Sequence, residues 1–300
     1  MLTLGDRSSP PSYWDQIVEE ILRAAPIPIW RAYMRRVYIR LMARWLRGSG
    51  PGPRLKTDLF EEAITPYHLL PELGPRGVGI DVSLTVVQAA RERLKIENRH
   101  HPLVVADLRA LPIRSGVMGQ ILSGSSLDHF SRKRDIATSL ADLARILAPG
   151  GLLVITFDNV HNPVVCLRNH LPFAWLNRLG LVPYYVGATY SRAEACRQLE
   201  ALGLVVTAVT AVAHAPRVFA IWLAALTERL GWPSLEALLS RVLDGLECLE
   251  RWPTRYRTGY YLAIRAEKPR PPATERTVRS REGGMLENGT SGSPNTRTDA

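Results

Sequence analysis

The stretch that decides the fold is GVGIDVS, residues 77–83. A short apolar run there ends in Asp81, and Ser83 follows as a helix N-cap, because its hydroxyl can accept a free backbone N–H. Apolar residues then recur at helical spacing, at Leu84, Val87, Ala90 and Leu94. A strand, an acid and a capped helix in this order predict part of a βαβ unit.

Strand-like runs alternate with helical segments on both sides of this stretch. We predict strands at 54–60, 77–82, 102–107, 119–124, 152–157, 204–210 and 259–266. We predict helices at 12–25, 30–46, 134–148, 216–230 and 233–250, together with one after Ser83 and one from a capping box at 191–194 to Gly203. The Pro-Gly-Gly at 149–151 is expected to end the helix before it. The pattern predicts a Rossmann-like, doubly wound α/β fold: a seven-stranded, mostly parallel sheet with helices on both faces.

Composition places the chain among globular proteins. Its 300 residues are 46% hydrophobic and 22% charged, unlike a disordered or fibrous protein. Three cysteines lie far apart without a CxxC pair, which excludes a disulfide framework and a thiolate zinc site. No apolar run approaches the ~18 residues of a membrane span, and the N-terminus lacks a signal-peptide pattern. We therefore expect a soluble, cytoplasmic protein without a bound metal.

The order of segments predicts three regions. A Gly- and Pro-rich stretch separates the N-terminal helices from the strand–helix alternation, and the C-terminal residues are almost devoid of apolar side chains. The expected regions are an N-terminal helical cap (1–53), an α/β domain (54–267) with insertions at 160–190 and 214–252, and a disordered tail (268–300).

Asp81 is the first candidate binding residue. In nucleotide-binding doubly wound folds, an acid at the end of the second strand accepts hydrogen bonds from ribose hydroxyls, and a carboxylate offers two oxygens to two adjacent donors. The alternative is an ordinary loop aspartate at a helix start. The 25-residue spacing from Lys56 in the first predicted strand, about half a βαβ unit, favours the binding role.

Several stretches in succession resemble one known family. GVGIDVS is followed by VVADLRALP (104–112), ILSGSSLDHF (121–130) and ARILAPGGLLVITFDN (144–159). In this order and at this spacing they resemble the signatures of class I S-adenosylmethionine-dependent methyltransferases. The resemblance covers roughly 54–210 and the last strand, and the first motif, KTDLFEEA, is similar to that of a bacterial small-molecule type.

The resemblance implies S-adenosylmethionine as the cofactor. The turn after the first strand would wrap the methionine part of the cofactor, through Thr57, Asp58, Leu59 and Phe60. Asp81 would bind the ribose hydroxyls, and Val82 would lie beside the adenine.

The third and fourth predicted strands supply the remaining implied contacts. Asp107 and Leu108 would hold the adenine edge, with Asp107 accepting from the exocyclic amine. Ser123 and Gly124 would flank the methionine moiety and the substrate entrance.

The chain departs from the family at its first loop. Residues 57–66 contain no glycine, although the family has a glycine-rich loop there because the backbone must approach the cofactor closely. The run 117–121 also lacks an acid often found before strand four. Either the cofactor sits differently, or its binding is weak or lost. A GxGxxG motif is absent too, which counts against a dehydrogenase.

His129 is the best candidate for a general base, because histidine titrates near neutral pH. The alternative is a histidine at a helix start that bonds to the backbone. Asp128 is expected to be structural. Asn159 and His161 are open between substrate contact and turn chemistry.

The covering segments are open to more than one interpretation. The aromatic residues of the 160–190 insertion suggest either a pocket wall or a patch over the sheet edge. The basic helix 30–47 suggests peripheral membrane contact, phosphate contact, or a cap with solvated arginines, and we favour the cap. We expect no nucleic-acid partner, since the NPPY-type tetrapeptide of base methylases is absent. The sequence does not determine the oligomeric state.

The sequence thus predicts an S-adenosylmethionine-dependent methyltransferase that acts on a small, partly apolar molecule. The alternative is a catalytically inactive methyltransferase-like binding or scaffold protein, which the missing glycines suggest.

Overall fold

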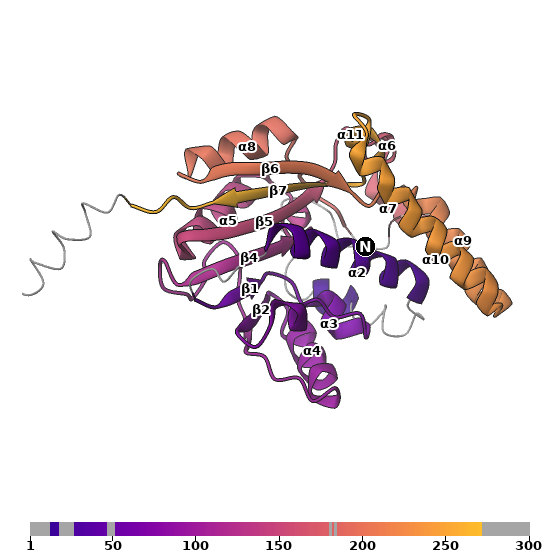
Figure 1. Cartoon of the computed structure of the whole chain (residues 1–300), viewed down its shortest axis with the longest axis horizontal. Helices are drawn as coiled ribbons and strands as arrows, with labels where there is room; N and C mark the ends of the chain where they lie inside the picture. Colours follow the sequence, from indigo (N-terminus) through magenta and orange to yellow (C-terminus); the bar gives the residue numbers. More distant parts are fainter. Residues whose placement is uncertain (1–12, 18–26, 47–51, 180–181, 183–184, 272–300) are drawn as a thin grey trace, which may run out of the picture.

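A seven-stranded sheet forms the core of the protein (Figure 1). The computed structural model describes residues 13–17, 27–46, 52–179, 182 and 185–271. The strands are β1 (Arg54–Lys56), β2 (Gly77–Asp81), β3 (Leu103–Val105), β4 (Met118–Gly124), β5 (Leu147–Asp158), β6 (Val205–Val212) and β7 (Tyr261–Glu267). Their order in the sheet is β3-β2-β1-β4-β5-β7-β6. Strands β1 to β5 pair in parallel and β7 is antiparallel to β5 and β6, which confirms the predicted sheet.

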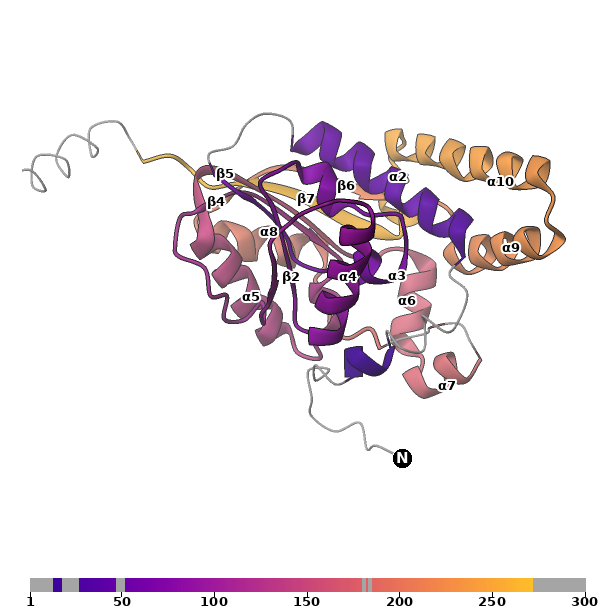
Figure 2. The ribbon, with the colours of Figure 1, turned by 90° about the horizontal axis from the view of Figure 1, so that it is seen from below.

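Helices cover both faces of this sheet (Figure 2). Those with residues in the core of one face are α2 (Pro28–Trp45), α3 (Phe60–Ile64), α4 (Leu84–Ile96), α9 (Arg217–Leu230) and α10 (Pro233–Leu246). Those in the core of the other face are α5 (Lys133–Ile146) and α8 (Arg192–Ala201). Successive strand residues alternate between the two cores, as the pleat requires: Ile121 enters one and Leu122 the other.

The first strand is shorter than predicted. It ends at Lys56, and α3 begins at Phe60, within the stretch that we predicted as strand. The reason is local, because the Asp58 carboxylate accepts the Phe60 backbone N–H at 2.9 Å and turns the chain.

One further prediction, about the end of α5, was wrong. The Pro-Gly-Gly at 149–151 does not end α5, which stops at Ile146; it lies inside β5, where Gly150 has a φ of 76° beside a register shift in the pairing with β4. The stretch 160–190 contains two short helices, α6 (Pro163–His170) and α7 (Phe173–Arg178). Asn162 caps α6 by accepting from the N–H groups of Val164 and Val165.

The helix ends with strong capping signals form as predicted. Ser83 accepts the Val86 N–H at the start of α4. Ser191 and Glu194 form a reciprocal capping box at the start of α8, and Gly203 follows that helix with a φ of 76°. The predicted helix at 233–250 is α10 followed by a 3-10 turn, Glu247–Arg251.

The basic side of α2 is engaged in ion pairs with the rest of the chain. Its arginines meet acids on α3, α10 and two 3-10 turns: Arg31–Glu61, Arg35–Glu72, Arg36–Asp244, Arg40–Asp244 and Arg44–Glu250, at 2.6 to 2.8 Å. The opposite side packs on the sheet, since seven residues of α2 are buried. The arginines that we expected to be solvated therefore form ion pairs, and α2 is packed between these acids and the sheet.

No helix among the described residues is long and apolar enough to cross a membrane. Of the predicted helix 12–25 only residues 13–17 are described, and they are helical. Beyond residue 271, the predicted tail (268–300) lies outside the described residues.

Candidate active site

The predicted site residues gather at one edge of the sheet. Because β1 to β5 run in parallel, their carboxyl ends meet there, at the edge where open α/β sheets bind ligands. Thr57 to Phe60 follow β1, Asp81 ends β2, Asp107 and Leu108 follow β3, and Ser123 and Gly124 end β4. The fold therefore brings all of these segments to one edge.

A buried ion pair shapes the glycine-free first loop. The Lys56 ammonium lies 2.9 Å from Glu62 and also bonds to Asp58, and the Lys56 and Glu62 side chains are 4% and 0% exposed. The other Glu62 oxygen accepts the backbone N–H groups of Leu69 and Leu70 at 3.0 and 2.9 Å. Burial lowers the pKa of Lys56, but Asp58 and Glu62 outweigh burial and raise it. Burial raises the pKa of Glu62, but Lys56 and the two backbone N–H groups together outweigh burial and lower it. Both groups are thus held charged.

Asp81 lies between the two segments that would surround a nucleoside. One carboxylate oxygen accepts the Leu59 N–H at 3.0 Å and the other accepts the Ser83 N–H at 2.9 Å. Each oxygen keeps a second lone pair for a ligand hydroxyl. Burial raises the pKa of Asp81 to about 7, and the two backbone hydrogen bonds counter only part of that effect. Val82 follows, half-buried.

Asp107 is held by a neighbour that sequence reasoning missed. The guanidinium of Arg109 forks onto its carboxylate, with an Nη2–Oδ2 distance of 2.6 Å, and the Arg109 N–H donates at 2.8 Å. Burial raises the pKa of Asp107, but these hydrogen bonds outweigh it and hold the pKa below its ordinary value. An adenine amine would share this carboxylate with Arg109. Leu108 is buried beside it.

Tyr38 of α2 packs on the end of β4 at this edge of the sheet. Sequence analysis did not select it as a site residue. A Cβ atom on Gly124 would lie 3.2 Å from the Tyr38 ring, so the ring would have to shift by a few tenths of an ångström to accommodate any other residue. The Tyr38 hydroxyl lies 3.0 Å from Thr156 Oγ1, and burial raises the pKa of Tyr38 to about 12. Ser123 is fully buried and accepts from Thr57 Oγ1 at 3.0 Å. The only sequence signal for Tyr38 was its place on the apolar side of the predicted helix.

His129 is oriented by the backbone. Its Nδ1 lies 3.1 Å from the Tyr185 carbonyl oxygen, and its ring meets Trp14 edge-on with centroids 4.6 Å apart. A carbonyl only accepts, so Nδ1 carries the proton and Nε2 is the basic nitrogen. Burial lowers the pKa of His129, which keeps the imidazole neutral. The backbone contact of the alternative interpretation is therefore present.

The acids next to His129 are structural, as expected for Asp128. Its carboxyl accepts the Asp158 backbone N–H at 2.8 Å, and burial, followed by the nearby Asp158 carboxylate, raises the pKa of Asp128 well above its ordinary value. Asp158 forms an ion pair with Arg168 at 2.7 Å. Asn159 is buried and donates to two backbone carbonyls, whereas His161 is exposed. The Asn159 Oδ1 also accepts the His161 backbone N–H at 3.2 Å, so turn chemistry and packing account for Asn159.

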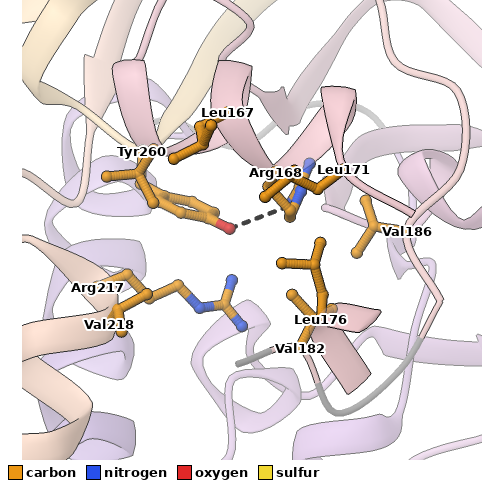
Figure 3. A pocket seen from close by; sticks show the side chains of 10 residues that line it. Leu167, Arg168, Leu171, Leu176, Val182, Val186, Arg217, Val218 and Tyr260 are labelled. Atoms are coloured by element: carbon orange, nitrogen blue, oxygen red, sulfur yellow. Dashed lines mark hydrogen bonds between the residues drawn. The ribbon is translucent and has the colours of Figure 1, made fainter. Parts of the chain in front are cut away.

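An apolar cavity of about 160 Å³ lies beyond the end of β5 (Figure 3). Its walls come from the 160–190 insertion, α9 and the residue before β7. The predicted aromatic wall does not line it. Tyr190 packs on Phe157 in the core, Phe173 packs on Tyr185, and Trp175 is 69% exposed. Tyr184, also part of that prediction, lies outside the described residues.

The part of the chain that the structure describes holds no group of three or more side chains that could bind a metal ion. The three cysteines, Cys166, Cys196 and Cys248, are free thiols.

Comparison with known proteins agrees with this architecture. Residues 65–155 match the model of a family described as "Methyltransferase domain". No curated protein sequence matches the chain. Among solved structures, the chain is similar to the cyclase SpnF, at 17% identity over 79% of this chain and 81% of that chain, with a TM-score of 0.50.

Two other solved structures are similar over a comparable span. One is a geranyl diphosphate methyltransferase in complex with GPP and sinefungin, at 17% identity over 77% of this chain and 76% of that chain. The other is a geranyl diphosphate C-methyltransferase from Streptomyces coelicolor in complex with Mg²⁺, geranyl diphosphate and S-adenosyl-L-homocysteine, at 15% identity over 77% and 78%. Both have a TM-score of 0.50, and the likeness describes the fold.

Proposed function

We propose that this chain, which carries a class I S-adenosylmethionine-dependent methyltransferase domain, transfers a methyl group to a small, partly apolar acceptor. The observation that carries the proposal is the position of Asp81. It ends β2 beside the turn after β1, and both of its oxygens have a lone pair left for the two hydroxyls of a ribose.

The residues at this edge fit the cofactor. Asp81 would hold the ribose with Val82 beside the adenine, and Asp107 and Leu108 would lie at the adenine edge. The turn from Thr57 to Phe60, with Ser123 and Gly124, would hold the methionine part. When bound, S-adenosylmethionine supplies an electrophilic methyl group on a sulfonium. The buried ion pair of Lys56 with Glu62 fixes the turn in place of the family's glycines.

The chain's own contribution is alignment, exclusion of water and one basic nitrogen. An in-line displacement gains much of its rate when the reacting atoms are held in line. Tyr38 and Trp14 cover the site over Gly124 and His129. The neutral His129 would accept a proton through Nε2 if the acceptor must lose one. The apolar cavity beyond β5 supports an acceptor with an apolar part.

A second candidate is a methyltransferase-like protein without catalysis that serves as a binding or scaffold protein. The glycine-free first loop favours it, because Leu59 already donates its N–H to Asp81 and brings a side chain where the family has none. The cyclase SpnF, which has a similar fold, is a further reason to test the reaction itself.

The decisive experiment is a calorimetric titration of the protein with S-adenosylhomocysteine. We expect Asp81→Ala to weaken binding ten- to a hundredfold, because hydrogen bonds to a charged group contribute about 1.5–3 kcal/mol. The matched control is Glu92→Gln, an exposed carboxylate on the helix after β2, which should bind like the parent. Equal affinity of Asp81→Ala and the parent would refute the site, and a folded parent that does not bind would favour the scaffold protein.

The pH dependence of the same titration provides a second test of the site. With a pKa of about 7, Asp81 is about one-tenth ionised at pH 6 and about nine-tenths ionised at pH 8. Because the carboxylate is the form that accepts two hydroxyls, we expect affinity to rise roughly tenfold between these pH values. Asp81→Asn should bind weakly with a flat profile. A flat profile for the parent would contradict the role of Asp81.

A further inference from the structure

The exposed side of α9 is apolar from its first turn to its last. Its two aromatic residues, Phe219 and Trp222, are each 59% exposed, and their rings stack with centroids 6.1 Å apart. The opposite side of the helix packs into the core with α2 and α10. The aliphatic residues of the exposed side recur at helical spacing: Val218, Leu226 and Leu230. A contiguous exposed apolar face of this kind marks an interaction surface.

The helices α6 and α7 extend this face. They lie beside the start of α9, because all three helices line the cavity beyond β5 (Figure 3). Leu167, Leu171 and Val218 line that cavity and are each at least 40% exposed, so they join the two groups. Figures 1 and 2 place α9 at one end of the molecule. We call the exposed residues of α9, together with four from this neighbouring segment, the apolar surface: Leu167, Leu171, Trp175 and Leu179.

The charge at the border of the apolar surface is positive. Residues 159–193, which include α6 and α7, contain no acid. The single acid of α9, Glu228, accepts the Ile29 N–H at 2.9 Å and so faces α2. Arg178 in the last turn of α7 and Arg229 in the last turn of α9 are exposed, and neither forms an ion pair with another described residue. These two guanidinium groups are therefore available to a partner.

Apolar area, tryptophan and positive charge together indicate the chemistry of the partner. Helices that lie in the interface of a lipid bilayer combine an apolar face of Trp, Phe and Leu with arginines or lysines. Tryptophan is enriched at the level of the headgroups, and the apolar stem of an arginine lets its guanidinium reach the phosphates. A second copy of this chain would bring the same positive charges, and like charges repel. An anionic bilayer supplies both the apolar area and the opposite charge.

We propose that the apolar surface docks on a lipid bilayer that contains anionic headgroups. Phe219 and Trp222 would enter the boundary between headgroups and acyl chains, and Arg178 and Arg229 would contact the phosphates. The docking helix is α9 and not the basic helix α2, because the arginines of α2 are engaged in ion pairs within the chain. The inference goes beyond the proposed function and does not depend on it, since these four residues lie outside the candidate active site.

The test is cosedimentation of the full chain with vesicles, made either of phosphatidylcholine alone or of phosphatidylcholine and phosphatidylglycerol in equal parts. We expect the parent to bind the mixed vesicles at least tenfold more tightly. Trp222→Glu should weaken that binding at least tenfold, because it removes a large apolar side chain from the lipid. The matched control is Ile96→Glu, at an exposed position on α4, which changes the net charge equally and should bind within about twofold of the parent.

A pair of arginine variants tests the charges. Arg229→Gln should weaken binding to the mixed vesicles about fivefold, the usual contribution of one arginine near an anionic surface. It should leave binding to phosphatidylcholine alone unchanged. Arg91→Gln, at an exposed position on α4, removes the same charge away from the apolar surface and should bind like the parent. Circular dichroism of each variant verifies that it is folded.

Any of four results would overturn the inference: a folded parent that binds neither kind of vesicle, equal affinity of the parent for both kinds, equal affinities of Trp222→Glu and Ile96→Glu, or equal affinities of Arg229→Gln and Arg91→Gln. Analytical ultracentrifugation then identifies another occupant. A dimer that Trp222→Glu dissociates, in a protein that binds no vesicles, would assign the apolar surface to a second copy of the chain. A folded protein that binds mixed vesicles but not S-adenosylhomocysteine overturns the methyltransferase function alone.

Discussion

Burial shifts the pKa of Asp81 upward and that of His129 downward, and both shifts favour the uncharged side chain. The cause is the same for both, since a group taken out of water loses the hydration of its charged form. In the role proposed for Asp81 the uncharged form opposes cofactor binding, because the ionised carboxylate is the form that accepts two hydroxyls. For His129 it is the form that can accept a proton. A pH above 7, where Asp81 is mostly ionised and His129 is neutral, therefore suits both roles.

We predict that His129 is neutral at pH 7 with its proton on Nδ1, and that it titrates below pH 6.5. Because the folded protein then binds fewer protons than the unfolded chain below pH 6.5, this group makes the protein less stable as the pH falls through that value. ¹⁵N NMR of the imidazole measures both the tautomer and the midpoint, and His129→Gln identifies the signal. A proton on Nε2, or a midpoint above pH 6.5, would count against a base at this position.

The turn from β1 into α3 shows how an element can be built without the residues its family uses. Where glycines would let the backbone bend closely, this chain bends through Asp58 and fixes the turn with Lys56 and Glu62. Glu62 also satisfies the backbone N–H groups of Leu69 and Leu70, which ties α3 to the segment before β2. The ion pair therefore organises two connections at once.

Removing one partner of this pair should destabilise the fold. Lys56→Met leaves Glu62 charged and buried, and we expect the free energy of unfolding to fall by about 3–5 kcal/mol. The double variant Lys56→Met, Glu62→Gln keeps an acceptor for Leu69 and Leu70 without the charge, and should recover most of that loss. Urea denaturation of the parent and the three variants completes the cycle. The prediction is wrong if the double variant is no more stable than Lys56→Met.

At the scale of the molecule, much of the positive charge of the N-terminal segment forms ion pairs with acids on neighbouring elements. Residues 1–54 carry nine arginines, and five of them on α2 pair with acids from α3, α10 and the 3-10 turns. The same helix supplies Tyr38 to the site. The charge that suggested contact with a membrane or with phosphate is thus directed toward partners within the chain.

We predict that Asp244→Asn, which removes the partner of both Arg36 and Arg40, lowers the free energy of unfolding by about 1 kcal/mol at low salt. These side chains are partly exposed, so salt screens the pairs and the difference should shrink in 0.5 M NaCl. Thermal unfolding at both salt concentrations measures it. Glu200→Gln, on the exposed side of α8, is the control. An undiminished difference at high salt would assign the effect to packing.

Local signals predicted the strands and helices of the sheet because each signal depends on neighbours in sequence. The alternation of strands and helices, Ser83 as a cap and the capping box at Ser191 all follow from hydrogen bonds that close within a few residues. The error at 149–151 occurred where a contact distant in sequence overrode the local signal. Gly150 is an ordinary helix stop by composition, yet its backbone N–H bonds to Lys268 and keeps it within β5.

The sequence by itself determined the fold class, and it placed the candidate site residues at one edge of the sheet, because strand direction places consecutive carboxyl ends together. Only the tertiary structure decided which side chains complete the site. Tyr38 over Gly124, Arg109 on Asp107, and the cavity shared by Arg168 and Arg217 follow from packing between segments that no local pattern connects. Their positions depend on how helices settle on the sheet, and that is fixed by the shapes and charges of distant surfaces.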